Sequence, residues 1–363
     1  MSRPDAPGPG TPGSRPGAAG PDGPGPDGPG SGAPGAGPRR LDGLDALPAG
    51  LDGSVVTVGM FDGVHRGHRA LLDRVAAEAV ERGVPAAAVT FDRHPLAVLR
   101  PGSEPPLLTT LDRKVELLGR AGMAVVLVLE FTEELSRVGA EDFAARVLFD
   151  GLAARAVVVG ENFRFGHKAA GDPALLAELG RPRGVEVVAV PLHAEAGQAV
   201  SSTRIRAELA AGDVEAAAAS LGRPYAVEGE VVVGDRRGGP LLGIPTANLA
   251  PTPGIALPAD GVYAGHLTDA VDHQPRPAAI SVGTNPQFGT ERRVEAHVLD
   301  FDGDLYGHRV AVAFAHRLRG QAVFDGPDEL ATQMRADIDQ ARRLLSSGPD
   351  DRVRTGGFSR PTP

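Results

Sequence analysis

The sequence predicts two domains: an α/β domain built on a parallel sheet, then a small antiparallel β-barrel closed by a helix. Up to about residue 221, apolar runs alternate with stretches of helical periodicity, which is the pattern of βαβ units with right-handed crossovers. After Tyr225 the apolar runs become short and are separated by Gly, Pro, Asp and Asn, as in antiparallel barrels. The last periodic stretch, 328–345, carries apolar residues along one face and forms the closing helix.

Each element follows from its local pattern. In the first domain, strands are expected at 55–58, 86–91, 124–129, 156–160 and 185–190, and helices near 68–82, 110–120, 141–149 and 173–180. In the second domain, strands are expected at 227–233, 261–267, 278–282, 294–300 and 310–316. Gly326 or Asp328 opens the final helix, and Pro327 suits its first turn. The domain boundary should fall near 215–224.

The two ends of the chain are rich in Gly and Pro. Residues 1–53 are expected to form a disordered tail and lead-in, because the stretch 1–38 cannot bury apolar area. G-x-G-x-x-G patterns occur in this tail, but they follow no strand and open no helix, so they predict no dinucleotide site. Residues 347–363 are expected to form a second flexible tail.

The composition excludes several classes of protein. The net charge of −9 argues against a nonspecific nucleic-acid binder, which would need a basic surface. The chain has no cysteine, which excludes disulfides and thiolate metal sites. It has no apolar run near the roughly 20 residues of a membrane helix and no segment resembling a signal peptide. We therefore expect a cytoplasmic protein without membrane or nucleic-acid partners, and no pattern indicates its oligomeric state.

The most informative segment is the glycine-rich turn 59–68, which lies between a predicted strand and a predicted helix. Such a turn directs backbone N–H groups and the positive end of a helix dipole into one space, which suits the phosphates of a nucleotide. Imidazoles at the helix start add donors for charge that develops when a phosphate is attacked. The histidines could instead be zinc ligands or core residues, although no third ligand is evident nearby. The candidate binding residues are Gly59, Phe61, Asp62 and Gly63, and the candidate catalytic residues are His65 and His68.

Two further segments of the first domain follow predicted strands and suit a nucleotide. The segment 200–206 gathers hydroxyls and guanidiniums at a helix start, so it is either a simple N-cap or a phosphate site. The segment 160–166 is either an ordinary βα loop or part of a base pocket, where Asn162 could bind an adenine or a ribose and aromatic side chains could line the base. The candidate residues of the segment 200–206 are Ser201, Ser202, Thr203 and Arg206.

Two segments of the second domain carry candidate metal and base residues. The first is 243–248, where Pro245 indicates a turn entering a strand. Its Thr246 and Asn248 offer the hard oxygen ligands that Mg²⁺ prefers. The second is 294–302, where alternation turns Glu295 and His297 to one face of a strand. They could be a surface pair, or Glu295 could accept the proton of an attacking hydroxyl.

These five segments, in this order, resemble the bacterial bifunctional riboflavin kinase/FMN adenylyltransferase family, commonly called FAD synthetase. The strongest similarities are F-D-G-x-H-x-G-H at 61–68, V-S-S-T-R-I-R at 200–206 and P-T-A-N at 245–248, supported by G-V-Y-A at 261–264 and G-T-N-P at 283–286. The resemblance implies an α/β nucleotidyltransferase-like fold with a Rossmann-like sheet for 54–221, acting as FMN adenylyltransferase. It implies a riboflavin kinase barrel for 222–346. The expected ligands are riboflavin, FMN, FAD and ATP, with Mg²⁺.

The resemblance also implies roles for individual residues. Glu295 takes the proton of the ribityl 5′-hydroxyl, while Thr246 and Asn248 hold Mg²⁺. His65 and His68 stabilise the attacked α-phosphate, and the hydroxyls and Arg206 of the segment 200–206 hold the departing phosphates. The chain departs from the family pattern at Arg93, at Gln287 and in the loop 237–243, which is one residue longer than usual.

Two alternatives remain open. The first is an aminoacyl-tRNA synthetase fragment, which shares an H-x-G-H turn but needs a basic RNA-binding surface and a lysine-rich late loop. The second is a non-catalytic flavin- or nucleotide-binding regulator, because a fold alone does not define an activity. The chain lacks the Walker A pattern, so a kinase site here is not of the P-loop type.

Overall fold

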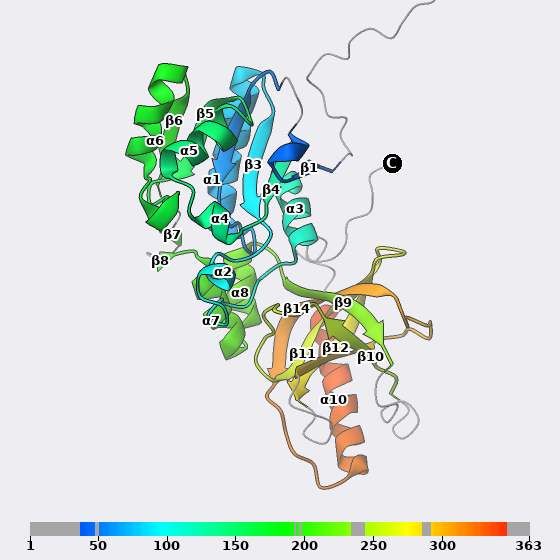
Figure 1. Ribbon diagram of the computed structural model, residues 1–363. Helices are drawn as coiled ribbons and strands as arrows, with labels where there is room; N and C mark the ends of the chain where they lie inside the picture. The colour runs from blue at the N-terminus through cyan, green and yellow to red at the C-terminus, as the bar shows by residue number, and fades with distance from the viewer. Residues whose placement is uncertain are drawn as a thin grey trace, which may run out of the picture.

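The computed structural model describes residues 37–47, 51–191, 194–195, 198–233, 244–284 and 292–346. It shows an α/β domain followed by a β-barrel with one long helix on its outer side (Figure 1). The predicted fold class is confirmed. The tails before residue 37 and after residue 346, the loop 237–243 and Gln287 lie outside the described residues.

The α/β domain is built on a six-stranded parallel sheet in the order β1-β4-β3-β2-β5-β6. Every residue of β2 and β4 is buried, as expected when helices cover both faces of a sheet. The strands are β1 (Arg39–Asp42), β2 (Ser54–Val58), β3 (Ala86–Phe91), β4 (Val125–Leu129), β5 (Ala154–Gly160) and β6 (Glu186–Val190). Five of them match the predicted strands, whereas β1 was not predicted.

Helices cover the two faces of this sheet in two hydrophobic clusters. On one face, Leu72 of α1 and Leu118 of α3 pack against Val126 of β4. On the other face, Phe143 and Leu176 pack against Leu127 of the same strand. The helices are α1 (Arg66–Arg82), α2 (Leu96–Leu99), α3 (Leu111–Arg120), α4 (Glu133–Ser136), α5 (Ala140–Phe143) with a π-helical continuation over Ala144–Phe149, α6 (Pro173–Gly180), α7 (Ser202–Ala211) and α8 (Val214–Leu221). Short 3-10 turns (Leu44–Ala46, His167–Ala169, Arg181–Arg183) and the hairpin β7 (Ala194–Glu195) and β8 (Gln198–Ala199) complete the domain.

The strand order places a topological switch point at the end of β2. This strand has β3 on one side and β5 on the other, so the chain direction across the sheet reverses at β2. Ligands of open parallel sheets bind at such switch points, beside the carboxyl ends of the strands. The turn 59–68 follows β2 and the loop 160–166 follows β5, so both lie at the end of the sheet where a ligand is expected.

The second domain is a closed antiparallel barrel in the order β10-β13-β12-β11-β14-β9. Its strands are β9 (Tyr225–Val232), β10 (Ala247–Pro251), β11 (Gly261–Asp269), β12 (Pro275–Thr284), β13 (Arg292–Val298) and β14 (Arg309–Arg319). β10, which the chain enters through Pro245, is the strand missing from the predicted set. Helix α10 (Pro327–Leu345) begins after the N-cap Gly326 and packs on the outside of β11 and β12 through Ala341, Ala264 and Ala279.

The two domains share one hydrophobic cluster. Ile205 and Leu209 of α7 and Leu221 of α8 pack with Tyr225 and Phe314 of the barrel. Figure 1 shows α7 and α8 close to β14. Helix α8 ends at Leu221 and β9 begins at Tyr225, so residues 222–224 are the only covalent link between the two domains.

Candidate active sites

The histidine turn joins β2 to α1 through left-handed backbone. Phe61, Gly63 and Val64 have φ values of 48°, 81° and 39°, a region that residues with a Cβ rarely adopt. His65 is the N-cap of α1, and its Nδ1 accepts a hydrogen bond from the His68 N–H at 3.3 Å. The two predicted histidines are therefore fixed at the first turn of the helix.

The two imidazole rings stack on one another, with centroids 3.6 Å apart and planes 18° apart. Gly67 makes this possible, because a Cβ there would lie 3.0 Å from the Val200 carbonyl oxygen and 3.1 Å from the His65 ring. The glycine of H-x-G-H thus allows the histidine turn to approach the segment that begins at Val200.

Burial keeps both imidazoles neutral near pH 7. It lowers the pKa of His65 to about 4, helped by the positive charges of Arg223 and Arg206. Burial, followed by His65, Lys114 and Arg223, lowers the pKa of His68 well below its ordinary value. Since Nδ1 of His65 is an acceptor, the proton of the neutral ring is on Nε2.

Nδ1 of His68 is buried and has no hydrogen-bond partner among the described residues. An unsatisfied buried polar atom needs an explanation, and a hydrogen bond with a ligand at this turn would supply one. The zinc alternative gains no support, because the part of the chain that the structure describes holds no cluster of three or more histidine, cysteine or carboxylate side chains suited to a metal.

Phe61 was expected to contact the nucleotide, but its side chain belongs to the core. The ring is 1% exposed and meets His68 edge-on at a centroid distance of 5.3 Å. Gly59 lies directly over it, since a Cβ on Gly59 would be 3.0 Å from the ring. The Phe61 ring therefore packs against the His68 ring from the side of the core.

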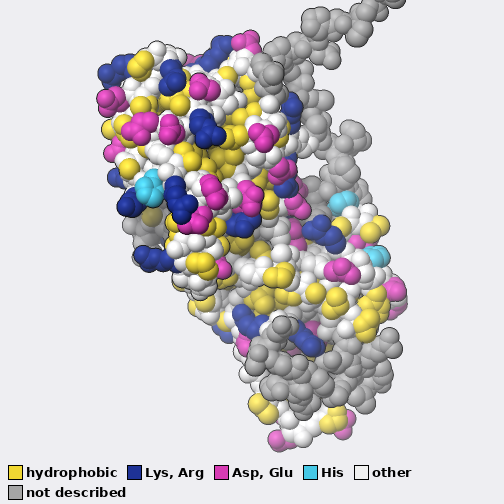
Figure 2. Space-filling view, viewed as in Figure 1, with side chains coloured by type: hydrophobic (Ala, Val, Ile, Leu, Met, Phe, Trp, Pro, Cys, Tyr) yellow, Lys and Arg dark blue, Asp and Glu magenta, His cyan; other side chains and the backbone are white. Residues whose placement is uncertain are grey.

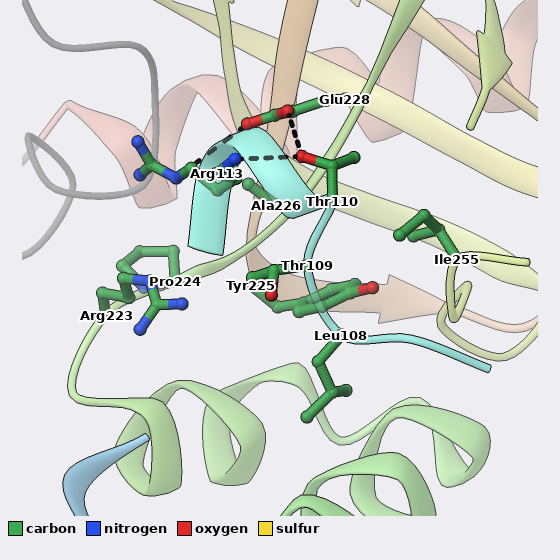
Figure 3. Close-up of a pocket in the computed structure, with 10 residues that line it drawn as sticks. All are labelled: Leu108, Thr109, Thr110, Arg113, Arg223, Pro224, Tyr225, Ala226, Glu228 and Ile255. Carbon is green, nitrogen blue, oxygen red and sulfur yellow. Dashed lines mark hydrogen bonds and ion pairs between the residues drawn. The ribbon is translucent and has the colours of Figure 1, made fainter. Parts of the chain in front are cut away.

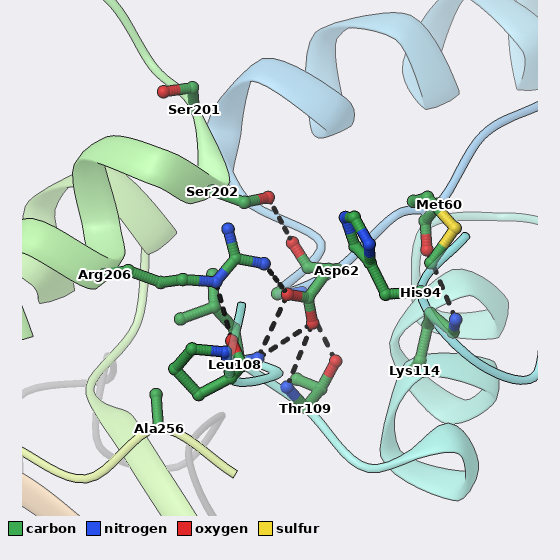
Figure 4. Close-up of polar contacts among 12 residues, drawn as sticks. Met60, Asp62, His94, Leu108, Thr109, Lys114, Ser201, Ser202, Arg206 and Ala256 are labelled. Carbon is green, nitrogen blue, oxygen red and sulfur yellow. Dashed lines mark hydrogen bonds and ion pairs between the residues drawn. The ribbon is translucent and has the colours of Figure 1, made fainter. Parts of the chain in front are cut away.

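Asp62 joins the turn 59–68 to the segment 200–206 (Figure 4). Its buried carboxylate accepts hydrogen bonds from the N–H groups of Leu108 (2.9 Å) and Thr109 (3.3 Å), and from Arg206 Nη2 (2.5 Å). The Ser202 hydroxyl donates to the Asp62 carbonyl at 2.9 Å. The turn 59–68 and the segment 200–206 therefore contact each other, but the Asp62 carboxylate is used for hydrogen bonds within the protein.

Two of the three guanidinium nitrogens of Arg206 are hydrogen-bonded within the protein, and the third points elsewhere. Its Nε donates to the Pro106 carbonyl at 2.6 Å while Nη2 binds Asp62. Figure 4 shows the remaining nitrogen directed towards the side where Ser202 lies. This nitrogen is the part of Arg206 that is placed to meet a ligand.

Of the other two hydroxyl residues in this segment, one caps helix α7 and the other is exposed. Ser201 is the N-cap of α7 and accepts from the Arg204 N–H at 3.2 Å, so the N-cap interpretation is confirmed. Thr203 is exposed at the first turn of the same helix. A helix N-terminus with exposed hydroxyls remains compatible with phosphate binding.

The loop after β5 presents Asn162 to solvent. The aromatic side chains beside it, which were expected to line a base pocket, stack on each other instead, with the rings of Phe163 and Phe165 at 5.3 Å. Phe165 is buried in the core of the sheet with Phe143. Asn162 is the residue of this loop that remains placed for a ligand.

Two basic side chains contact the histidine turn, although no sequence pattern predicted it. Lys114 of α3 donates to the carbonyls of Met60 (3.2 Å) and Phe91 (2.7 Å), and burial lowers its pKa to about 8. Arg223 donates to the Gly63 carbonyl at 2.6 Å. Lys114 lies 54 and 23 residues from Met60 and Phe91, and Arg223 lies 160 residues from Gly63, so no local motif indicates them.

In the barrel, the predicted metal and base residues meet on adjacent strands. Asn248 of β10 lies directly opposite Glu295 of β13 in the antiparallel register. Their neighbours Leu249 and Val294 point into the barrel core, so Asn248 and Glu295 project from the outer face. The Asn248 amide nitrogen donates to the Thr246 carbonyl at 3.4 Å, which turns the amide oxygen to the opposite side.

A cavity of about 530 Å³ lies between the domains, beside Arg206 but away from both histidines and Glu295. Arg206, Ile255, Leu257 and Arg292 are among its lining residues. It touches the adenylyl-transfer residues only through Arg206. Neither histidine nor Glu295 lines it, so we assign it no part in the chemistry.

Comparison with known proteins agrees with this geometry. The bifunctional riboflavin kinase/FMN adenylyltransferase of Escherichia coli (strain K12) is 35% identical over 295 residues, which span 81% of this chain and 93% of that protein. The chain belongs to this family. The protein of the same description from Pseudomonas fluorescens is 37% identical over 296 residues, covering 81% of this chain and 94% of the relative. Residues 48–204 match the FAD synthetase family and residues 221–345 the riboflavin kinase family. The resemblance inferred from the motifs is confirmed.

A solved structure shows the same two-domain fold. The chain described as a macrolide-efflux protein from Streptococcus pneumoniae superposes with a TM-score of 0.75 at 31% identity, covering 84% of this chain and 98% of that chain. Within the described ranges, no helix combines the length and apolarity needed to cross a membrane. On the face shown in Figure 2, basic and acidic side chains are interspersed.

Proposed function

We propose that this protein phosphorylates riboflavin to FMN in its barrel, residues 222–346, and joins FMN to AMP in its α/β domain, residues 54–221, giving FAD. The observation that carries the proposal is that each domain matches one of the two corresponding families and brings that family's motif residues together. ATP is the co-substrate of both steps. Since both steps consume ATP, we place the protein in the cytoplasm.

In the adenylyl transfer, a phosphate oxygen of FMN attacks the α-phosphorus of ATP. A bond forms between this oxygen and the phosphorus, the bond to the bridging oxygen of the β-phosphate breaks, and pyrophosphate leaves. FMN phosphate is already an anion, so positioning and charge stabilisation provide the catalysis rather than a strong base.

The chain supplies this stabilisation from two sides of the crevice. His65 and His68 offer neutral imidazoles at the N-terminus of α1, where the helix dipole also favours an anion. Ser201, Ser202, Thr203 and the outward nitrogen of Arg206 receive the departing phosphates at the N-terminus of α7. The N–H groups of Gly59 and Gly63 donate within the protein, to the Val89 carbonyl at 3.0 Å and to Thr109 Oγ1 at 3.3 Å, so these glycines shape the turn. Asn162 binds the adenosine part.

In the kinase step, Glu295 accepts the proton of the ribityl 5′-hydroxyl as that oxygen attacks the γ-phosphorus of ATP. The bond from the γ-phosphorus to the oxygen that bridges it to the β-phosphate breaks, and ADP leaves. Thr246 and Asn248 fit a magnesium ion, because they present hydroxyl and amide oxygens beside a carboxylate on one face of the barrel. When bound, the ion neutralises charge on the transferring phosphate. The Asn248–Glu295 register holds the oxygen donors and the base next to each other.

The test is to incubate the purified full-length chain with riboflavin, ATP and Mg²⁺ and to separate the flavins by chromatography. We expect FMN and then FAD to form, and FAD to form from FMN and ATP alone. Riboflavin that stays unchanged would overturn the proposal. Tight flavin binding without any product would support the non-catalytic regulator instead.

A further inference from the structure

The link between the domains carries a guanidinium that holds the histidine turn. Arg223 Nη2 donates to the Gly63 carbonyl at 2.6 Å, and Nη1 donates to the Val64 carbonyl at 3.3 Å. It also reaches the Leu221 carbonyl at 3.4 Å. One side chain therefore joins the end of α8 to the residues immediately before His65.

The turn needs such an external contact. Gly63 and Val64 both have positive φ, and for the β-branched Val64 this conformation costs free energy that the surroundings must supply. The planar fork of an arginine presents two separate nitrogens to the two neighbouring carbonyls, whereas a lysine would have to serve both from a single nitrogen. Arg223 thus stabilises the strained backbone that sets the direction of the His65 ring.

The backbone of Arg223 is itself held firmly. Gly222 caps α8 in a left-handed conformation with φ of 75°, and Pro224 restricts the backbone of the preceding residue, Arg223. Tyr225 follows in the barrel core, where its hydroxyl donates to the Ala256 carbonyl at 2.5 Å. Figure 3 shows Arg223 and Pro224 beside a small cavity, with Arg113 and Glu228 on its other side.

The charge of Arg223 also acts on the site. Burial lowers its pKa to about 9, so the side chain stays protonated at neutral pH. Its positive charge is one cause of the lowered pKa of His65 and of His68.

We infer that Arg223 is a positioning residue for adenylyl transfer, which holds the Gly63–Val64 backbone so that His65 and His68 face the α-phosphate of ATP. The inference rests on the proposed adenylyltransferase function. Arg223 does not touch the reacting atoms: it acts through the two carbonyls and through its charge. Arg223 lies in the link between the domains, so a residue outside the nucleotide site sets the position and the pKa of its two imidazoles.

The test compares Arg223→Met with Arg223→Lys in the full-length protein. We expect kcat for FAD formation from FMN and ATP to fall about 10- to 100-fold in Arg223→Met, the size of effect that a misplacement of about 1 Å produces. The KM for ATP should stay within about threefold, since the residue does not bind ATP directly. Arg223→Lys keeps the charge but not the fork, so its kcat should fall less than that of Arg223→Met.

Arg317→Met is the matched control, because Arg317 also joins the domains through carbonyls, donating to Ala211 at 2.9 Å and Asp260 at 3.3 Å, but does not contact the histidine turn. It should leave FAD formation unchanged, and all variants should keep riboflavin phosphorylation. The acid limb of kcat/KM should move to higher pH in Arg223→Met, because a charge that disfavours protonation of His65 is lost.

Three results would overturn the inference: a kcat in Arg223→Met within twofold of wild type, an equal loss in Arg317→Met, or a parallel loss of kinase activity. Should Arg223→Met fail to fold, Arg223→Lys decides, and an unchanged kcat in that variant rejects the positioning role. A wild-type protein that makes FMN but no FAD would instead reject the proposed adenylyl transfer itself.

Discussion

Replacing Asp62 by Asn tests whether this carboxylate is a structural anchor of the adenylyl-transfer site. The Asp62 and Arg206 side chains are 5% and 14% exposed, and their charged groups meet at 2.5 Å. The amide keeps one acceptor for the Leu108 N–H but removes the charge that balances Arg206. Arg206 would then retain only the Pro106 carbonyl as an acceptor among the contacts described here.

The size of the effect follows from burial. Removing one partner of a buried ion pair costs about 3–5 kcal/mol, and the retained acceptor places this variant near the lower value, about 3 kcal/mol. For a domain of this size, each kcal/mol lowers the melting temperature by roughly 2–4 °C. We therefore expect the α/β domain to melt about 6–12 °C lower, combining the two.

Calorimetry of the full-length protein measures this shift, with Asp73→Asn as the control. Asp73 pairs with Arg69 in the same domain, but the two side chains are 57% and 50% exposed, so their pair is worth less than about 1 kcal/mol. A shift in Asp62→Asn no larger than that in Asp73→Asn would refute the reasoning. In a double-mutant cycle, Arg206→Met should add little to Asp62→Asn, because both changes remove the same interaction.

Three further outcomes are expected. Glu295→Gln should lower kcat for riboflavin phosphorylation roughly 10²- to 10⁴-fold while FAD formation from FMN persists. The control Glu230→Gln, on the exposed face of β9, should change neither rate. Near-normal kinase turnover in Glu295→Gln would reject the assignment of Glu295 as the base. Replacing His65 and His68 together by Ala should abolish FAD formation but leave FMN formation, which separation of the flavins measures; loss of both activities would indicate misfolding. Because His65 has a pKa of about 4 when folded and near 6.5 when unfolded, the unfolded state binds more protons between these values, and stability falls as the pH drops through this window. Between pH 7.5 and pH 5 His65 contributes about 2 kcal/mol of this loss of stability. The variant His65→Asn keeps an N-cap acceptor, so its free energy of unfolding, measured with denaturant, should depend less on pH than that of the wild type. An equal pH dependence in the variant and the wild type would contradict a buried neutral His65.

The sequence predicted most strands because their patterns are local. The runs that became β2, β3 and β4 are mostly apolar and otherwise contain only Ser or Thr, and Gly, Pro or charged residues lie at most of their ends. β1 was missed because Leu41 is its only buried residue and its pairing with β4 is made by the backbone. β10 was indicated only as a strand entered from Pro245, because Pro and Thr weaken the apolar pattern at its start.

The motifs predicted the partners of the adenylyl-transfer site but not how each side chain is used. H-x-G-H indicated both imidazoles, and the structure adds that Gly67 allows the close approach of Val200. Phe61 could not be assigned from its motif, because the direction of its ring depends on the left-handed turn it belongs to. Lys114 and Arg223 reach carbonyls of this turn from distant parts of the chain, so only the fold brings them there.

One short segment shows why the two domains depend on each other. The N–H groups of Leu108 and Thr109 bind the Asp62 carboxylate in the first domain. The residue just before them, Leu107, exchanges two backbone hydrogen bonds of 2.8 Å with the barrel, from its N–H to Gly254 and from Ala256 to its carbonyl. Thr110, just after them, donates to Glu228 of β9 at 3.0 Å, a carboxylate whose pKa burial raises. Any displacement of the barrel therefore moves the donors that fix Asp62, and through Asp62 the turn that carries His65.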